Sequence, residues 1–139
     1  MIVLNDIELV SFMRALKLLK DREFLISYFY MGGNYLDGME KQLLRMLDES
    51  GQIEIFELSN DFYSFCNNCD KEKLRLETTD ISSVYYAKMN NLPLVTTCQN
   101  VKNFAELNNV KVLGIDEALK FVNSSQDAIN FLNNMIKVI

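Results

Sequence analysis

The chain has 139 residues, which is the size of a single domain, and we expect residues 1–139 to form one. Hydrophobic residues make up 49% of it and charged residues 24%, a balance typical of a globular protein with a buried core and not of a disordered chain. The sequence contains no histidine, which excludes Ser-His-Asp and Cys-His nucleophiles, histidine-based ribonuclease sites and histidine-ligated zinc.

Charge and cysteine content limit the expected partners and compartment. Fourteen basic residues against 19 acidic ones give a net charge of −5, which disfavours sequence-independent binding of long nucleic acids unless Lys and Arg cluster locally. Three cysteines and one proline do not make a disulfide framework, so we expect a reducing, cytoplasmic location. Residues 1–6 lack the basic start of a signal peptide, and no apolar run is long enough to cross a bilayer, so we expect no membrane association.

The first half of the chain alternates short apolar runs with amphipathic stretches. Apolar residues at strand or helix spacing, bounded by Gly, Asn and Asp, mark each element. In order, we expect a strand at Ile2–Leu4, a helix from Ile7 to Leu19, a strand at Phe24–Phe29, a helix from Leu36 to Leu47 and a strand at Ile53–Phe56.

The second half continues this alternation, with residues 70–73 as a charged connection. We expect a helix from Asp61 through Cys66, a helix from Thr78 to Met89, a strand at Leu92–Val95, a helix at Val101–Leu107, a strand at Val110–Leu113, and helices at Glu117–Val122 and Gln126–Ile136. Strands separated by helices require right-handed crossovers and favour a parallel sheet that is covered on both faces. The sequence therefore predicts a three-layer α/β/α sandwich with a mostly parallel sheet of about five strands.

Acidic and polar residues follow the strands of this predicted sheet. Sites in open parallel sheets form beyond the carboxyl ends of the strands, near the point where the strand order reverses. Asp6 follows the first strand, Thr96-Thr97-Cys98 follows the fourth, and Asp80 lies in the first turn of the preceding helix. A purely structural interpretation is also open, because Asp6 is well placed to cap a helix and Asp80 to complement a helix dipole.

The order of these features resembles that of a PIN domain. Asp80 opens a helix, the small residue Ala87 comes seven positions later, and an apolar strand ends in the triplet Thr96-Thr97-Cys98, followed by a helix and another strand. These features resemble the second half of the family. The start of the chain, Ile2-Val3-Leu4-Asn5-Asp6, resembles its opening strand, which runs into a metal-binding Asp.

The resemblance implies a ribonuclease fold in which three or four acidic side chains hold Mg²⁺ or Mn²⁺. By this resemblance Asp6 matches the first acid and Asp80 the third. The second acid is expected on the helix after the second strand, where we choose Glu40, with Asp37 as its rival three residues earlier. Glu40 on an amphipathic helix is equally open to interpretation as a solvated charge.

The sequence departs from the family at the fourth acidic position, where Cys98 stands. A thiol is a poor ligand for Mg²⁺, so one carboxylate of the expected site is lost.

Two functions therefore stay open. One is a metal-dependent endoribonuclease, the toxin of a toxin–antitoxin pair, with RNA as substrate and a small antitoxin protein as partner. It would need basic residues beside the acids, for which the candidates are Lys71, Lys73, Arg75 and Lys102. The other is a catalytically inactive PIN-like binding or scaffolding module.

Three further features have mainly structural interpretations. Cys66 and Cys69 lack the second pair or the histidines of a zinc site, so we expect neighbours on a helix face. The aromatic residues Phe62, Phe65, Tyr85 and Tyr86 fall at helical spacing and are expected in the core or an interface. The segment from Ala128 to Ile139 is apolar to its end, from which we expect either burial in the core or a homodimer.

Overall fold

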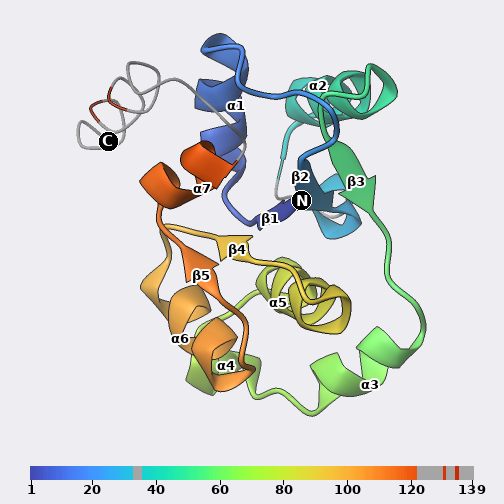
Figure 1. The fold of residues 1–139 in the computed structure, drawn as a ribbon. Coiled ribbons are helices and arrows are strands. Elements are labelled where there is room, and N and C mark those ends of the chain that lie inside the picture. The colour runs from blue at the N-terminus through green and yellow to red at the C-terminus, as the bar shows by residue number, and fades with distance from the viewer. Residues whose placement is uncertain (33–35, 122–129, 131–133, 135–139) are drawn as a thin grey trace.

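A computed structural model of the chain describes residues 1–32, 36–121, 130 and 134. Strands and helices alternate along the chain, as the colours of Figure 1 show. The elements are β1 (Ile2–Leu4), α1 (Ile7–Ala15), β2 (Phe24–Ser27), the 3-10 helix η1 (Tyr28–Met31), α2 (Gly38–Glu49), β3 (Glu54–Phe56), α3 (Asp61–Asn67), α4 (Lys71–Leu74), α5 (Thr78–Asn90), β4 (Leu94–Val95), α6 (Gln99–Leu107), β5 (Val112–Leu113) and α7 (Ile115–Phe121). None of the described helices combines the length and apolar character that a bilayer crossing requires.

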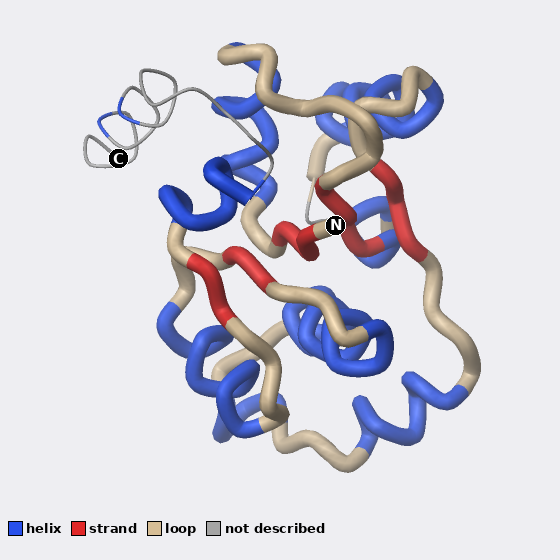
Figure 2. The backbone as a smooth tube through the Cα atoms, in the orientation of Figure 1, coloured by secondary structure: helices blue, strands red, loops and turns tan. Residues whose placement is uncertain are grey.

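The five strands form one parallel sheet in the order β3-β2-β1-β4-β5. The central strand is β1, in which Val3 pairs with Leu25 of β2 on one side and with Leu94 of β4 on the other. The chain adds β2 and β3 on one side of β1 and returns through α5 to add β4 and β5 on the other. The strand order therefore reverses between β1 and β4, which is where sheets of this kind place their sites. Figure 2 shows the short strands lying between helices, and the predicted three-layer α/β/α sandwich is confirmed.

Alternating side chains of the strands build two separate cores, one on each face of the sheet. Ile2 and Leu4 of β1 belong to the core that packs against α1, α2 and α7, whereas Val3 between them belongs to the core that packs against α3, α5 and α6. Figure 1 shows the same division, with α1, α2 and α7 above the sheet and α3, α5 and α6 below it. The continuous apolar runs in the sequence arise because each strand is buried on both faces.

Single side chains explain two of the differences between the predicted and the observed elements. The strand expected over residues 24–29 ends at Ser27, because the Ser27 hydroxyl accepts a hydrogen bond from the Phe29 N–H at 3.2 Å and turns the chain into η1. The charged stretch expected as a connection forms the single-turn helix α4, which the Asp70 carboxylate caps at the Lys73 N–H.

The first helix is shorter than its apolar spacing predicted. It ends at Ala15, and the backbone turns left-handed at Lys17, which has φ of 57°. Leu18 and Leu19 are buried all the same, so the apolar pattern there reflects a packed loop and not a further helical turn. Within the predicted helix over residues 126–136, residues 130 and 134 are described, and both are helical. The rest of that helix, and the apolar side chains at the end of the chain on which the homodimer prediction rests, lie outside the described residues.

Candidate functional site

A hollow of about 250 Å³ opens beyond the carboxyl end of β1, at the point where the strand order reverses. Its lining comes from three parts of the chain: the residues after β1 together with the first residues of α1, the 3-10 helix η1, and the first turn of α5. The lining residues are Asn5, Asp6, Ile7, Glu8, Tyr30 and Asp80. Asp6 and Asp80, which are 74 positions apart in the sequence, therefore share one cavity, where the resemblance places the first and third acids.

Asp80 is held by two donors of the protein. Its Oδ1 accepts a hydrogen bond from the Asn5 side-chain Nδ2 at 2.9 Å, and its Oδ2 accepts one from the Glu77 backbone N–H at 3.0 Å. The second bond is half of a capping box between Glu77 and Asp80 that closes the first turn of α5. Asp80 is thus both a helix-capping residue and the link between α5 and the end of the central strand.

Asp6 stands at the N-cap position of α1, yet its side chain does not cap that helix. Its carboxylate instead accepts the backbone N–H of Thr97, and its Oδ1 lies 3.4 Å from the Thr96 hydroxyl, which donates to it. These bonds join the end of β1 to the segment after β4. The alternative interpretation of Asp6 as a helix cap is therefore correct for the backbone position and wrong for the side chain.

Burial raises the pKa of the Asp6 carboxyl above its ordinary value of 3.8. The hydrogen bonds from Thr97 and Thr96 oppose this rise by stabilising the charged form, while the nearby Glu8 carboxylate adds to it by repulsion. The net shift is upward, because the loss of solvation outweighs the hydrogen bonds. A carboxylate in this state is harder to ionise than an exposed one.

Asn5 is the residue of the hollow that sequence reasoning missed. Its side chain is buried and bonds to Asp80 through Nδ2, while its Oδ1 has no hydrogen-bond partner in the described part of the chain. The Tyr30 hydroxyl donates to the Asn5 backbone carbonyl at 2.7 Å and so fixes this turn from the side of η1. The signal for Asn5 was its position directly after the apolar strand, which is the same signal that singled out Asp6.

Buried polar groups in the described residues gather at this edge of the sheet. They lie at the end of β2, directly after β1 and β4, or in the first half of α5, and they are Asn5, Ser27, Thr79, Ser82, Ser83 and Thr96. The Ser27 and Ser82 hydroxyls are 2.6 Å apart and bond to each other across the sheet and α5. Burying a polar group costs stability unless the group is hydrogen-bonded. The concentration of buried polar groups at the carboxyl edge therefore distinguishes this edge from the rest of the interior, which is apolar.

The structure does not bring the predicted second acid into the hollow. Glu40 and Asp37 are exposed and bond to each other in a capping box at the start of α2, where Asp37 Oδ1 accepts the Glu40 N–H at 2.8 Å and Glu40 Oε1 accepts the Asp37 N–H at 3.2 Å. Neither lines the cavity that contains Asp6 and Asp80. Within the described residues, no three His, Cys, Asp or Glu side chains are arranged to hold a metal ion. Among the described residues, Asp6 and Asp80 are therefore not joined by Glu40 or Asp37 in a site of three carboxylates, and the Mg²⁺ or Mn²⁺ site stays a prediction.

Cys98 and the expected basic residues also lie apart from the hollow. Cys98 is exposed at the N-cap of α6, and its N–H donates to the Thr96 hydroxyl at 3.2 Å. Among the basic candidates, Lys71 donates to the Thr78 hydroxyl at 2.8 Å, at the start of α5. No Lys or Arg is among the described residues that line the cavity, and the polar side chains in this part of the lining are acidic or neutral.

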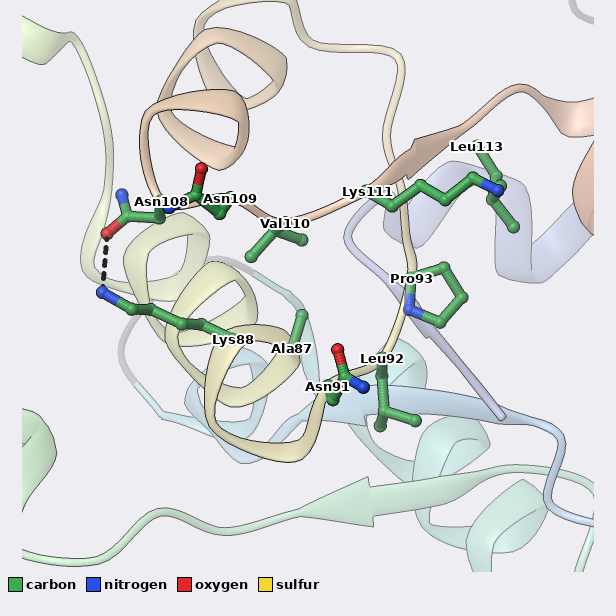
Figure 3. A pocket seen from close by; sticks show the side chains of 10 residues that line it. All are labelled: Ala87, Lys88, Asn91, Leu92, Pro93, Asn108, Asn109, Val110, Lys111 and Leu113. Carbon is green, nitrogen blue, oxygen red and sulfur yellow. Dashed lines mark hydrogen bonds between the residues drawn. The ribbon is translucent and has the colours of Figure 1, made fainter.

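A larger hollow of about 460 Å³ lies at the opposite edge of the sheet, where the chain enters β4 and β5 (Figure 3). Its polar lining is basic or neutral, with Lys88, Lys111 and three asparagines around an apolar floor of Leu92, Pro93 and Val110. The Lys88 ammonium donates to Asn108 Oδ1 at 3.4 Å and lies 5.6 Å from the centre of the Phe65 ring. This hollow contains no carboxylate, and the amino edge is not where parallel sheets place their catalytic groups.

Comparison with models of known families found none that matches this chain, and comparison with curated proteins and with solved structures found no significant match. The arrangement of an all-parallel five-stranded sheet with Asp6 and Asp80 in one cavity therefore rests on the chain's own geometry.

Proposed function

We propose that the chain is a PIN-like domain that acts as a binding or scaffolding module and does not cleave RNA. The parallel sheet with β1 at its centre is compatible with a PIN-like fold, and Asp6 and Asp80 lie beside one another at its carboxyl edge. The hydrogen bonds that these two carboxylates accept favour the binding role over the nuclease role.

The observation that carries this proposal is the direct bond between Asn5 Nδ2 and Asp80 Oδ1 at 2.9 Å. The Asn5 amide donates to one oxygen of Asp80, and the Glu77 N–H donates to the other. Asp6 is bound in the same way by Thr96 and Thr97. Each of these hydrogen bonds balances part of the negative charge of its carboxylate, so the two groups attract a hard cation less strongly than unbonded carboxylates would.

A metal-dependent endoribonuclease remains the second candidate, because two of its three predicted acids share one cavity. This function would require a further anionic ligand and a nearby basic surface for RNA. With this second candidate go the toxin role, the RNA substrate and the antitoxin partner, which stay predictions. The homodimer, expected from the apolar end of the chain, is a separate prediction.

An RNA-cleavage assay with Mn²⁺ separates the two candidates. We expect the wild-type chain to produce no cleavage above that of Asp6→Asn and Asp80→Asn variants, since none of the three holds a catalytic metal. Glu106→Gln, an exposed carboxylate on α6, is the matched control for loss of one negative charge. Cleavage by the wild type and by the control that both aspartate variants abolish would overturn the binding module and establish the nuclease.

A further inference from the structure

A second hollow at the carboxyl edge, of about 410 Å³, lies beyond β2 and β3 and has aromatic walls. It is lined by Tyr28, Phe29, Gly32, Glu57, Leu58 and Tyr63. Because Ser27 pairs with Phe56 at the ends of the two strands, the next residues, Tyr28 and Glu57, leave the sheet side by side. The chain then runs from β3 to α3 (Figure 1). Tyr63 of α3 lines the same hollow.

The aromatic walls combine exposed rings with a rigid support. Tyr28 is 53% exposed and Tyr63 55%, so both rings are accessible to a ligand at this hollow. Behind them Phe62 is fully buried, and its ring centre lies 5.3 Å from that of Phe29 and 5.7 Å from that of Tyr63. The Phe29 and Tyr63 rings, which contact Phe62, are held in place before binding and therefore lose little conformational entropy when a ligand arrives.

The charge of this hollow is negative. Among the described residues, Glu57 is the only acidic or basic side chain of the lining, and no Lys or Arg forms an ion pair with it. The chain as a whole has a net charge of −5. Aromatic faces beside an unpaired carboxylate attract a flat or compact organic cation, through cation–π contact with the rings and a charge-assisted bond to the carboxylate.

We propose that this aromatic hollow binds an arginine side chain of a partner protein, with its guanidinium stacked between Tyr28 and Tyr63 and bonded to Glu57. Arginine fits better than lysine, because its planar group stacks on a ring while its N–H fork meets a carboxylate. A nucleotide base would also stack on the tyrosines, but Glu57 would repel the phosphate that accompanies it. The inference rests on the proposed binding role, for which it names the class of partner.

The test is a titration of the ¹⁵N-labelled chain with the capped peptide acetyl-Gly-Arg-Gly-amide, followed by amide chemical shifts. We expect shifts at Tyr28, Phe29, Glu57 and Tyr63. The citrulline analogue, which has the same shape without the charge, should bind about ten-fold more weakly. Glu57→Gln and Tyr63→Ala should each weaken arginine binding about three-fold. Their matched controls are Glu106→Gln and Leu107→Ala, which change an exposed carboxylate and an exposed apolar side chain on α6 and should leave binding unchanged.

Three results would overturn the inference: no shifts at this hollow, equal binding of the citrulline peptide, or larger shifts at the same residues with uridine monophosphate, which would indicate a nucleotide platform. The readout is independent of RNA cleavage. Cleavage that depends on Asp6 and Asp80 would overturn the proposed binding role, whereas the arginine-dependent shifts decide the identity of the ligand at the aromatic hollow.

Discussion

The two hollows at the carboxyl edge differ in whether their acidic groups have partners. In the acidic hollow beyond β1, Asp80 and Asp6 are bonded to Asn5, Glu77, Thr96 and Thr97. In the aromatic hollow beyond β2 and β3, Glu57 has no ion-pair partner among the described residues, and two tyrosines stand exposed around it. Carboxylates at one edge of a sheet can therefore have different roles. Those that accept hydrogen bonds from the protein link the elements of the fold, whereas those without a partner are open to a ligand.

The largest difference between the hollows should appear when one carboxylate is removed from each. Asp80→Ala leaves the buried Asn5 amide without its acceptor and breaks the capping box of α5, so we expect a loss of about 1–3 kcal/mol in the free energy of unfolding. Glu57→Ala removes an exposed group and should change it by less than about 0.5 kcal/mol. Urea unfolding of both variants measures this. Equal losses would contradict the distinction between bonded and free carboxylates.

A smaller difference is expected between two neighbouring tyrosines of η1. Tyr30→Phe removes the buried bond from its hydroxyl to the Asn5 carbonyl, and we expect it to cost about 1 kcal/mol of stability. Tyr28→Phe changes an exposed hydroxyl and should be neutral within about 0.5 kcal/mol. The same unfolding experiment checks both variants. If Tyr28→Phe were the more destabilising, η1 would not anchor the acidic hollow in the way described.

The smallest effect is the pH dependence that Asp6 contributes. Its pKa is raised by burial in the folded state, so the folded chain holds this proton more tightly than the unfolded one. Stability from this group is therefore fully present below the ordinary value of 3.8 and is lost as the pH rises through the raised folded pKa. Asp6→Asn keeps an acceptor for Thr97 and removes the titration, so its stability relative to wild type should increase from pH 3.5 to pH 7. A relative decrease over this range would show that the folded pKa is lowered instead.

Apolar periodicity was sufficient to predict the fold. The strands are buried on both faces, so Ile2–Leu4 and the runs at residues 24–27 and 94–95 stand out as short apolar segments between helices. Two of the errors came from single side chains that act on the backbone. Ser27 ends β2 by accepting the Phe29 N–H, and Asp70 caps α4 within a stretch that its charges had marked as a connection. Such local bonds leave no periodic pattern.

The site was predictable only in part. The rule for parallel sheets placed Asp6 and Asp80 at one edge, and they share a cavity there. The bond between Asn5 and Asp80 joins residues 75 positions apart, and no spacing in the sequence encodes it. The exposed tyrosines were missed for a related reason, since Tyr28 was assigned to a strand and only the pairing of β2 with β3 brings it beside Glu57.

The most direct test of the account is a titration of the ¹⁵N-labelled chain with Mn²⁺, whose paramagnetism broadens the amide signals of residues near a bound ion. We predict no selective broadening at Asn5, Asp6 or Asp80 at submillimolar Mn²⁺, because the two carboxylates are already engaged by protein donors. Saturable broadening of these three amides that Asp80→Asn abolishes would contradict the account, since it would mean that the acidic hollow is a metal site.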